Sequence, residues 1–326
     1  MFFALQPCTD PFPAEVHRLA DFPSIAPGAG VTDIHIVFLN LALAVLGVPV
    51  NGRRPAVPGE RGDLSLHETV LRWGMRQHVT VYPGGGCVPG LSPVVFHELG
   101  NRVTTLFTSV PDVRSAWPDA VPTSVPVATT FYTPPEADAG DPLRLAFVGD
   151  DRPRKGLAVL LEALQSLEVS WTLDVVGPHS RHGAAMSSLG SRVTDHGWLE
   201  PSQLRSVLRR CNVLVAPASR DLPSDGYGDV GMVDGFPTTA ALVGMLSGCC
   251  LVGTNPGNAL SPLVADEDWV AVPERDPVAL TQALRGLSAD PARRRAVAAC
   301  GRQRVVSSFD VRTVVDAKLQ RMGLTS

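Results

Sequence analysis

The second half of the chain alternates short apolar runs with longer amphipathic segments, and this alternation restricts the possible folds more than any other feature. Strand-like runs lie at 143–148, 171–176, 193–199, 212–216, 249–252 and 269–272. Helix-like segments lie at 156–167, 201–210, 277–287, 291–308 and 311–322. Strands that alternate with helices predict an α/β fold with a parallel, doubly wound sheet.

The first half is less regular and predicts a second, shorter sheet. Strand-like runs lie at 2–5, 48–50, 78–82, 93–96, 103–109 and 125–128, and helix-like segments at 34–46 and 66–73. A segment rich in Pro, Asp and Gly at 133–142 has the composition of a linker. We therefore expect two domains that meet near residue 135.

Composition excludes several classes of protein. A length of 326 residues suits two domains, and the net charge of −4 does not support a nucleic-acid partner. The six cysteines have neither zinc-site nor disulfide-framework spacing. Residues 1–5 lack the features of a signal peptide, and the apolar run at 36–50 is too short to span a bilayer. We expect a soluble, cytoplasmic protein without a transmembrane segment.

The segment 234–256 predicts an anion site at the edge of the second sheet. Asp234 and Gly235 precede Phe236 and Pro237, and proline is well tolerated where a helix begins. Two threonines follow, and the run at 249–252 has the pattern of a buried strand. A helix N-terminus carries free N–H donors and partial positive charge, which suits a phosphate. An ordinary strand–helix crossover remains the alternative.

A basic loop follows the run at 143–148. It contains Gly149, Arg152, Arg154 and Lys155, and the only other lysine in the sequence is Lys318. Fixed cations at this position are suited to a leaving group that gains negative charge. A solvated turn remains the alternative.

Two features of the first half are candidate ligand contacts. Gly28 and Gly30 precede the predicted helix 34–46, and glycines there allow a ligand to approach the backbone, although Asp33 breaks the dinucleotide-binding pattern. His97 follows the predicted strand 93–96, and ligands of open α/β sheets bind beyond the carboxyl ends of strands. A plain turn and a structural histidine remain the alternatives.

The opening Asp234-Gly235-Phe236-Pro237, together with Lys155-Gly156, resembles the C-terminal half of retaining glycosyltransferases of family 4. The resemblance implies two Rossmann-like domains with parallel sheets that face each other across a cleft, the GT-B architecture. It implies an acceptor-side domain at 1–135 and a nucleotide-sugar-binding domain at 136–309. It also implies a C-terminal helix at 310–326 that crosses back to the first domain.

The resemblance also implies roles for single residues. Asp234 and His97 would contact the donor sugar, and Lys155 would hold the donor diphosphate. Arg152 would replace the arginine of the family, whose position is Asp150 here, with Arg154 as second choice. Residues that would hold sugar or phosphate oxygens through backbone or hydroxyl groups are Gly28, Gly30, Gly149, Gly235, Phe236, Pro237, Thr238 and Thr239.

One departure from the family concerns the nucleotide. A second glutamate eight positions after the first acid binds the ribose in the family, but Leu242 and Val243 occupy the candidate positions here. Other residues would have to supply that affinity: Ser109, Trp198, Leu199 or the loop 221–233. The loop is rich in Gly and Asp, and the sequence does not decide whether it is a mobile lid or a plain insertion.

The resemblance implies a retaining, metal-independent glycosyltransferase that moves a sugar from a nucleotide diphosphate sugar, of the UDP or GDP type, to a small-molecule acceptor. The short N-terminal domain and the composition suggest a role in natural-product or glycan biosynthesis, and a homodimer is left open. No cofactor is expected. The alternatives are a catalytically silent relative that binds a nucleotide sugar or a partner transferase, and an epimerase or phosphorylase on the same fold.

Overall fold

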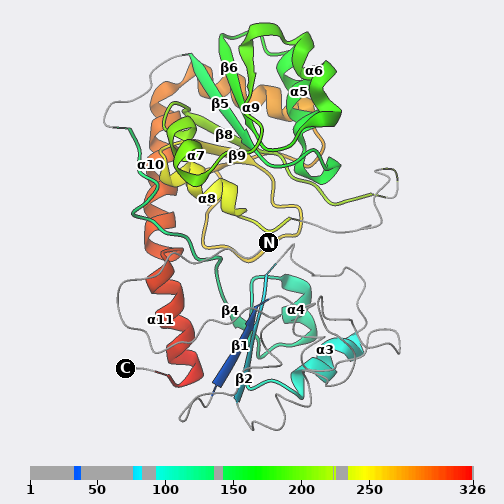
Figure 1. Cartoon of the computed structure of the whole chain (residues 1–326), viewed down its shortest axis with the longest axis vertical. Helices are drawn as coiled ribbons and strands as arrows, with labels where there is room; N and C mark the ends of the chain where they lie inside the picture. Colours follow the sequence, from blue (N-terminus) through cyan, green and yellow to red (C-terminus); the bar gives the residue numbers. More distant parts are fainter. Residues whose placement is uncertain are drawn as a thin grey trace.

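The computed structural model describes residues 33–37, 76–82, 93–135, 142–222, 224 and 234–324. Two parallel sheets, one from each half of the chain, form two lobes (Figure 1). The predicted α/β class with two parallel sheets is confirmed. The predicted segments at 2–5, 48–50 and 66–73 lie outside the described residues.

The C-terminal sheet has six strands in the order β7-β6-β5-β8-β9-β10, and every neighbouring pair is parallel. The strands are β5 (Leu143–Val148), β6 (Trp171–Val176), β7 (Val193–Asp195), β8 (Val213–Ala216), β9 (Cys250–Gly253) and β10 (Val270–Ala271). In chain order this is 3-2-1-4-5-6, the doubly wound order of dinucleotide-binding folds. The order reverses between β5 and β8.

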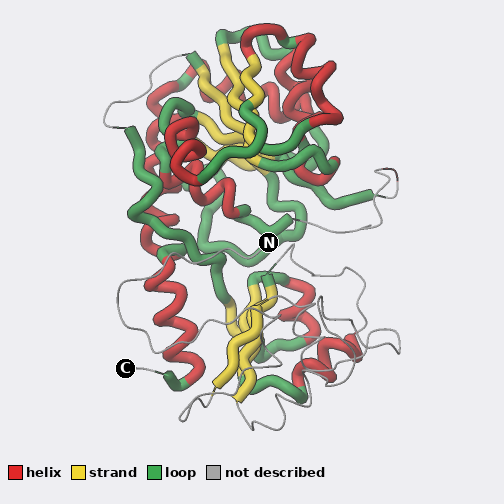
Figure 2. The backbone as a smooth tube through the Cα atoms, viewed as in Figure 1, coloured by secondary structure: helices red, strands yellow, loops and turns green. Residues whose placement is uncertain are grey.

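Helices cover both faces of this sheet, as Figure 2 shows. One face packs against α5 (Leu157–Gln165), α6 (Gly183–Ser188) and α9 (Pro277–Ala289), and the other against α7 (Pro201–Leu208) and α8 (Thr239–Leu246). Alternate residues of β5 enter different cores, since Leu145 and Phe147 lie with α5 whereas Ala146 lies with α8. Helix α10 (Pro291–Ser308) contributes to both cores. The short 3-10 turns are η2 (Pro153–Lys155), η3 (Ser180–His182) and η4 (Gly190–Arg192).

The N-terminal sheet has four described strands in the order β1-β2-β3-β4, all parallel. Its elements are β1 (Asp33–Val37), β2 (Arg76–Val81), α3 (Pro93–Gly100), β3 (Thr105–Thr108), α4 (Pro111–Ala116) and β4 (Val121–Pro122).

Three predictions for this half are wrong. The described start of the predicted helix 34–46 is strand β1, which pairs in parallel with β2 from Asp33 to Val37. The predicted strand 93–96 begins helix α3, in which Val95 and Leu99 are buried four residues apart. Short apolar runs do not distinguish helix from strand. The predicted strand 125–128 forms only an isolated bridge, from Val127 to Asp310.

Helix α11 (Val311–Met322) runs from the end of α10 along the N-terminal sheet (Figure 1). Its buried side chains recur every four residues, at Val314, Lys318 and Met322. The ammonium Nζ of Lys318 donates to Thr80 Oγ1 at 3.1 Å and to Tyr82 OH at 2.8 Å. The helix thus joins the last segment of the chain to the first sheet. The predicted domain limits themselves stay a prediction.

The face of the N-terminal sheet that packs against α11 carries several polar side chains, although it is largely buried. His35 Nε2 lies 2.7 Å from Thr80 Oγ1, and His78 Nε2 lies 2.7 Å from Asp33 Oδ1. Burial lowers the pKa of Lys318 to about 7. Burial, together with the charge of Lys318 and of His78, lowers the pKa of His35 to about 3. Among the described residues the acceptors of Lys318 are hydroxyl groups, and no carboxylate there offsets the cost of burying its charge.

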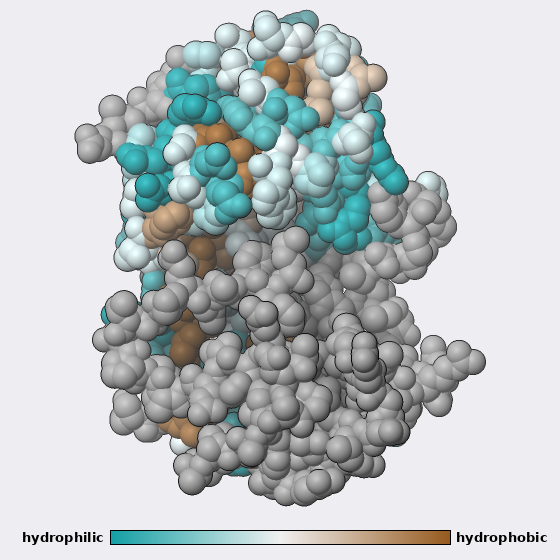
Figure 3. Space-filling view, in the orientation of Figure 1, coloured by the Kyte–Doolittle hydropathy of each residue, from teal (hydrophilic) through white to brown (hydrophobic). Residues whose placement is uncertain are grey.

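No described helix is both long and apolar enough to cross a bilayer. Figure 3 agrees, since the described part of the face it shows is mostly hydrophilic, with separate apolar patches.

We predict that Lys318→Met reduces the pH dependence of stability. The folded-state pKa of about 7 lies below the ordinary value of 10.5, so the unfolded chain holds the extra proton between these pH values. The wild-type free energy of unfolding should therefore rise with pH in that window, by up to about 1.4 kcal/mol per pH unit from this group. Urea unfolding at pH 6, 7, 8 and 9 measures the difference, and equal slopes in both proteins would contradict the assignment.

Candidate active site

The loops after β5 and β8 meet where the strand order of the C-terminal sheet reverses. Ligands of open α/β sheets bind in the crevice beyond the carboxyl ends of the strands at such a point. The two loops are in direct contact, because the Ser219 amide donates to the Arg154 carbonyl at 2.8 Å. A third segment, which begins at Asp234 and leads into α8, contacts the same loop through ion pairs. Three segments far apart in sequence thus converge here.

Gly156 sets the direction of the loop after β5. It ends η2 and caps the start of α5 with φ of 78°, in the left-handed region. A Cβ atom at this position would lie 2.0 Å from the carbonyl oxygen of Pro217. Only glycine allows this close approach, which fixes the backbone direction beside the preceding Lys155.

A chain of ion pairs joins the three segments. Lys155 Nζ lies 2.8 Å from Asp234 Oδ2, and Arg154 Nε lies 3.5 Å from Asp234 Oδ1. Arg154 also donates through an Nη atom to Asp221 Oδ2 at 2.7 Å. Arg154, Asp221 and Asp234 are all buried, so these charges depend on one another for compensation.

Arg152 forms a separate pair with Asp150. Its Nε atom donates to the two carboxylate oxygens at 3.0 and 2.9 Å, and its Nη atom contacts Oδ2 at 2.5 Å. Burial raises the pKa of Asp150, but the larger combined effect of hydrogen bonds from Arg152 and of nearby positive charge lowers it overall. The predicted diphosphate ligand Arg152 is thus already paired.

The predicted helix start at Pro237 is confirmed within two residues. Thr238 is the N-cap of α8, and its Oγ1 accepts a hydrogen bond from the Ala241 amide at 3.1 Å. Phe236 is buried with its ring centroid 4.4 Å from that of Trp269, and Pro237 is buried beside it. Thr239, the first residue of α8, is exposed.

The remaining predicted residues of the second half are scattered. Gly149 contributes its carbonyl to a 3.0 Å contact with His179 Nε2. Trp198 has 68% of its surface exposed, and Leu199 is partly buried against the core near α7. Gly235 is partly buried between Asp234 and Phe236. The roles of these residues in donor binding stay predictions.

The described candidates of the first half, His97 and Ser109, are not members of the ion pairs. His97 is exposed on α3, so its predicted position after a strand is wrong. Ser109 is buried at the end of β3, where its carbonyl accepts from the Leu260 amide at 3.1 Å and so connects the two halves. Gly28 and Gly30 lie outside the described residues.

Sequence reasoning missed the roles of Asp150 and Asp221. In the sequence, Asp150 stands out only as a departure from the family, and Asp221 only as the first residue of a Gly- and Asp-rich loop. One signal for Asp150 was available, its spacing of two residues from Arg152. No such signal exists for Asp221, which meets Arg154 across 67 residues of chain.

The structure accounts for the missing second acid. Leu242 and Val243 are buried in the core between α8 and the sheet, at 0% and 5% exposure. A carboxylate in place of either would lose its hydration without a charged partner. Helix α8 therefore uses for core packing the positions at which the family that this chain resembles carries its ribose-binding acid.

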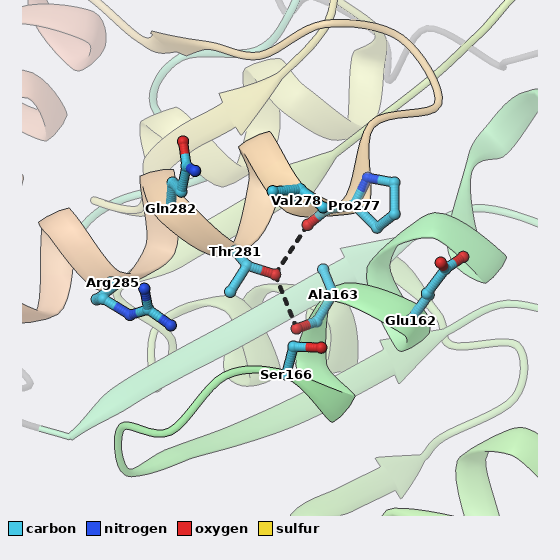
Figure 4. Close-up of a pocket in the computed structure, with 8 residues that line it drawn as sticks. All are labelled: Glu162, Ala163, Ser166, Pro277, Val278, Thr281, Gln282 and Arg285. Atoms are coloured by element: carbon cyan, nitrogen blue, oxygen red, sulfur yellow. Dashed lines mark hydrogen bonds between the residues drawn. The ribbon is translucent and has the colours of Figure 1, made fainter.

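Among the described residues, no cluster of His, Cys, Asp or Glu could hold a metal ion. A pocket of about 220 Å³ lies elsewhere, on the outer side of the C-terminal lobe between α5 and α9 (Figure 4). Thr281 bridges the two helices there by donating to the Ala163 and Pro277 carbonyls. That pocket shares no lining residue with the ion pairs.

Comparisons with known proteins show similarity in sequence to one family and in fold to several solved structures. The family model described as glycosyl transferases group 1 matches residues 142–290. A search of curated proteins gives no match. Among solved structures, Alr3699/HepE of Anabaena in complex with UDP has 13% identity and a TM-score of 0.63, with 79% of this chain and 75% of that chain covered.

Two further solved structures share the fold. Sucrose-phosphate synthase from Thermosynechococcus elongatus has 18% identity and a TM-score of 0.60, with 78% of this chain and 69% of that chain covered. A glycosyltransferase from Rickettsia africae has 14% identity and a TM-score of 0.60, with 80% and 74% covered. The two-lobed fold is the GT-B fold, and the chain is a glycosyltransferase. The residues that match the group 1 model form most of its C-terminal lobe.

We predict that Gly156→Ala destabilises the protein and disrupts the arrangement of Lys155. The new Cβ would meet a backbone oxygen in a left-handed conformation, which should cost about 2 kcal/mol or more. Gly183→Ala is the matched control, because Gly183 begins α6 with ordinary helical φ and nothing lies within 4 Å of the added Cβ. Thermal unfolding of both variants tests this, and equal midpoints would show that the approach to Pro217 imposes no constraint.

Proposed function

We propose that the chain is a retaining, metal-independent glycosyltransferase of family 4 that transfers a sugar from a nucleotide diphosphate sugar to a small-molecule acceptor. One observation carries the proposal: Lys155 and Asp234, 79 residues apart, pair at 2.8 Å where the sheet order reverses. The crevice therefore presents both a cation for a diphosphate and a carboxylate for sugar hydroxyls.

The chemistry requires stabilisation of the leaving group. When the bond between the anomeric carbon and the diphosphate breaks, negative charge grows on the phosphate oxygens. Lys155 and the amides at the start of α8, near Thr239, are donors that can stabilise that charge without a metal ion. Retention of configuration rests on the family resemblance. In that mechanism the leaving phosphate takes the proton of the acceptor.

UDP is the first nucleotide to test. Alr3699/HepE is described in complex with UDP and with UDP-glucose, and it shares the fold of this chain. Leu242 is buried in the core and cannot bind the ribose. Residues at other positions than in the family that this chain resembles therefore have to hold it. A cytoplasmic location and a small acceptor of natural-product or glycan biosynthesis complete the proposal.

We predict that Lys155→Met lowers kcat/KM for the donor at least about tenfold, which corresponds to about 1.4 kcal/mol of transition-state stabilisation. The loss should arise because the methionine keeps most of the length of the side chain but not the charge. UDP-glucose turnover, with and without candidate acceptors, is the measurement.

Arg285→Met is the control, since it removes one positive charge from the outer pocket between α5 and α9. Kinetics of Lys155→Met that match those of the control would reject the role of Lys155. Thermal-shift titration of the wild type with UDP, GDP and TDP establishes the nucleotide. Binding of a nucleotide without turnover of any donor would instead favour a donor-binding protein that lacks transfer activity.

A further inference from the structure

Each basic side chain of the loop after β5 has a carboxylate partner in the structure. The pairs are Arg152 with Asp150, Arg154 with Asp221, and Lys155 with Asp234. A diphosphate that enters the crevice therefore competes with carboxylates for every one of these cations. Which of these ion pairs opens when the donor binds therefore determines which cation contacts the diphosphate.

The Arg154 pair is the least able to open. The side chains of Arg154 and Asp221 have exposures of 5% and 1%, so separating them would leave two buried charges uncompensated. The side chain of Lys155 is 23% exposed and ends in a single ammonium on a flexible stem. Lys155 can therefore turn toward a ligand while Arg154 stays in place.

Asp234 is suited to lose one partner and gain another. Its Oδ1 atom lies 3.5 Å from Arg154 Nε, so the carboxylate keeps a cation nearby when Lys155 leaves. Its Oδ2 atom is buried, and its close partner in the described part of the chain is Lys155 Nζ at 2.8 Å. When Lys155 leaves, this buried oxygen needs another donor, and a hydroxyl group can supply one.

We propose that the Lys155–Asp234 ion pair is the resting state of the donor site and that donor binding exchanges its partners. Lys155 moves to the diphosphate, the Oδ2 atom of Asp234 accepts a hydrogen bond from a sugar hydroxyl, and Arg154 remains on Asp234. This exchange rests on the proposed function. Arg154 is then a positioning residue, because it acts on the donor only through Asp234.

The exchange has a consequence for product release. After transfer, the nucleotide diphosphate remains without the sugar, and Asp234 has lost its hydroxyl partner. The carboxylate then competes with the bound diphosphate for Lys155. Asp234 should therefore weaken binding of the bare nucleotide but strengthen binding of the intact donor. A residue that only binds the sugar would strengthen donor binding without affecting the bare nucleotide.

The test is a double-mutant cycle on the full chain with the nucleoside diphosphate that binds the wild type most tightly among UDP, GDP and TDP. Calorimetric Kd values are measured for the wild type, Asp234→Asn, Lys155→Met and the double variant. Asp234→Asn should bind the nucleotide at least about threefold tighter than wild type, while its turnover of UDP-glucose or the matching donor falls. In the Lys155→Met background the same substitution should change the Kd by much less.

Asp150→Asn is the matched control, because it removes an equal charge from the same loop but from a pair with Arg152. Its effect on the Kd should differ between the wild type and the Lys155→Met background much less than that of Asp234→Asn, since Asp150 pairs with Arg152 and feels Lys155 only as a nearby charge. If Asp234→Asn lowers the Kd of the nucleotide by the same factor in both backgrounds, the effect is a general one of the removed charge, and the exchange is overturned. Unchanged or weaker nucleotide binding by Asp234→Asn would overturn it as well.

A measurement without any variant covers the case in which Asp234→Asn fails to fold. The chain has two lysines, so the ammonium spectrum of lysine-labelled wild type contains one side-chain signal for Lys155 and one for Lys318. Addition of the nucleotide should shift the Lys155 signal and leave that of Lys318 in place. A Lys155 signal that stays fixed at saturation would overturn the exchange, whereas no binding of UDP, GDP or TDP would reject the proposed function itself.

Discussion

The buried guanidinium of Arg154 holds the candidate site together. It lies between Asp221, which follows β8, and Asp234, which precedes α8, while its own backbone accepts a hydrogen bond from Ser219. A buried cation has to keep its carboxylates, and the carboxylates have to keep their cation. Three segments that the sheet brings to one edge are thereby held in a fixed relation, and the more exposed Lys155 is left as the partner that can move.

A different constraint connects the two lobes. Helix α11 places Lys318 on the hydroxyl groups of Thr80 and Tyr82, and the backbone of Val127 pairs with the turn between α10 and α11. The last helix thus belongs in sequence to the C-terminal half and in packing to the N-terminal sheet. In a GT-B fold the cleft lies between the lobes, so contacts that set their relative position also shape the acceptor side of the proposed site.

Much of the second half could be predicted, and much of the first could not. The helices at 291–308 and 311–322 were predicted to the residue, because long amphipathic segments with clear caps carry their own signal. The predictions for the runs at 34–46 and 93–96 were wrong, because short apolar segments fit either a strand or a helix until their neighbours are known. His97 was misplaced for that reason alone, since the argument for it depended on the end of a strand.

The sequence by itself determined the α/β class, the basic loop with Lys155 and the acidic helix start at Asp234, because each of these is a local pattern. Only the tertiary structure decided that these two residues pair, that Asp221 shares Arg154 with Asp234, and that Leu242 faces the core. The physical reason is that a charge pair across 67 or 79 residues depends on which strands are neighbours. Strand order is a property of the whole sheet, and no local window of the chain contains it.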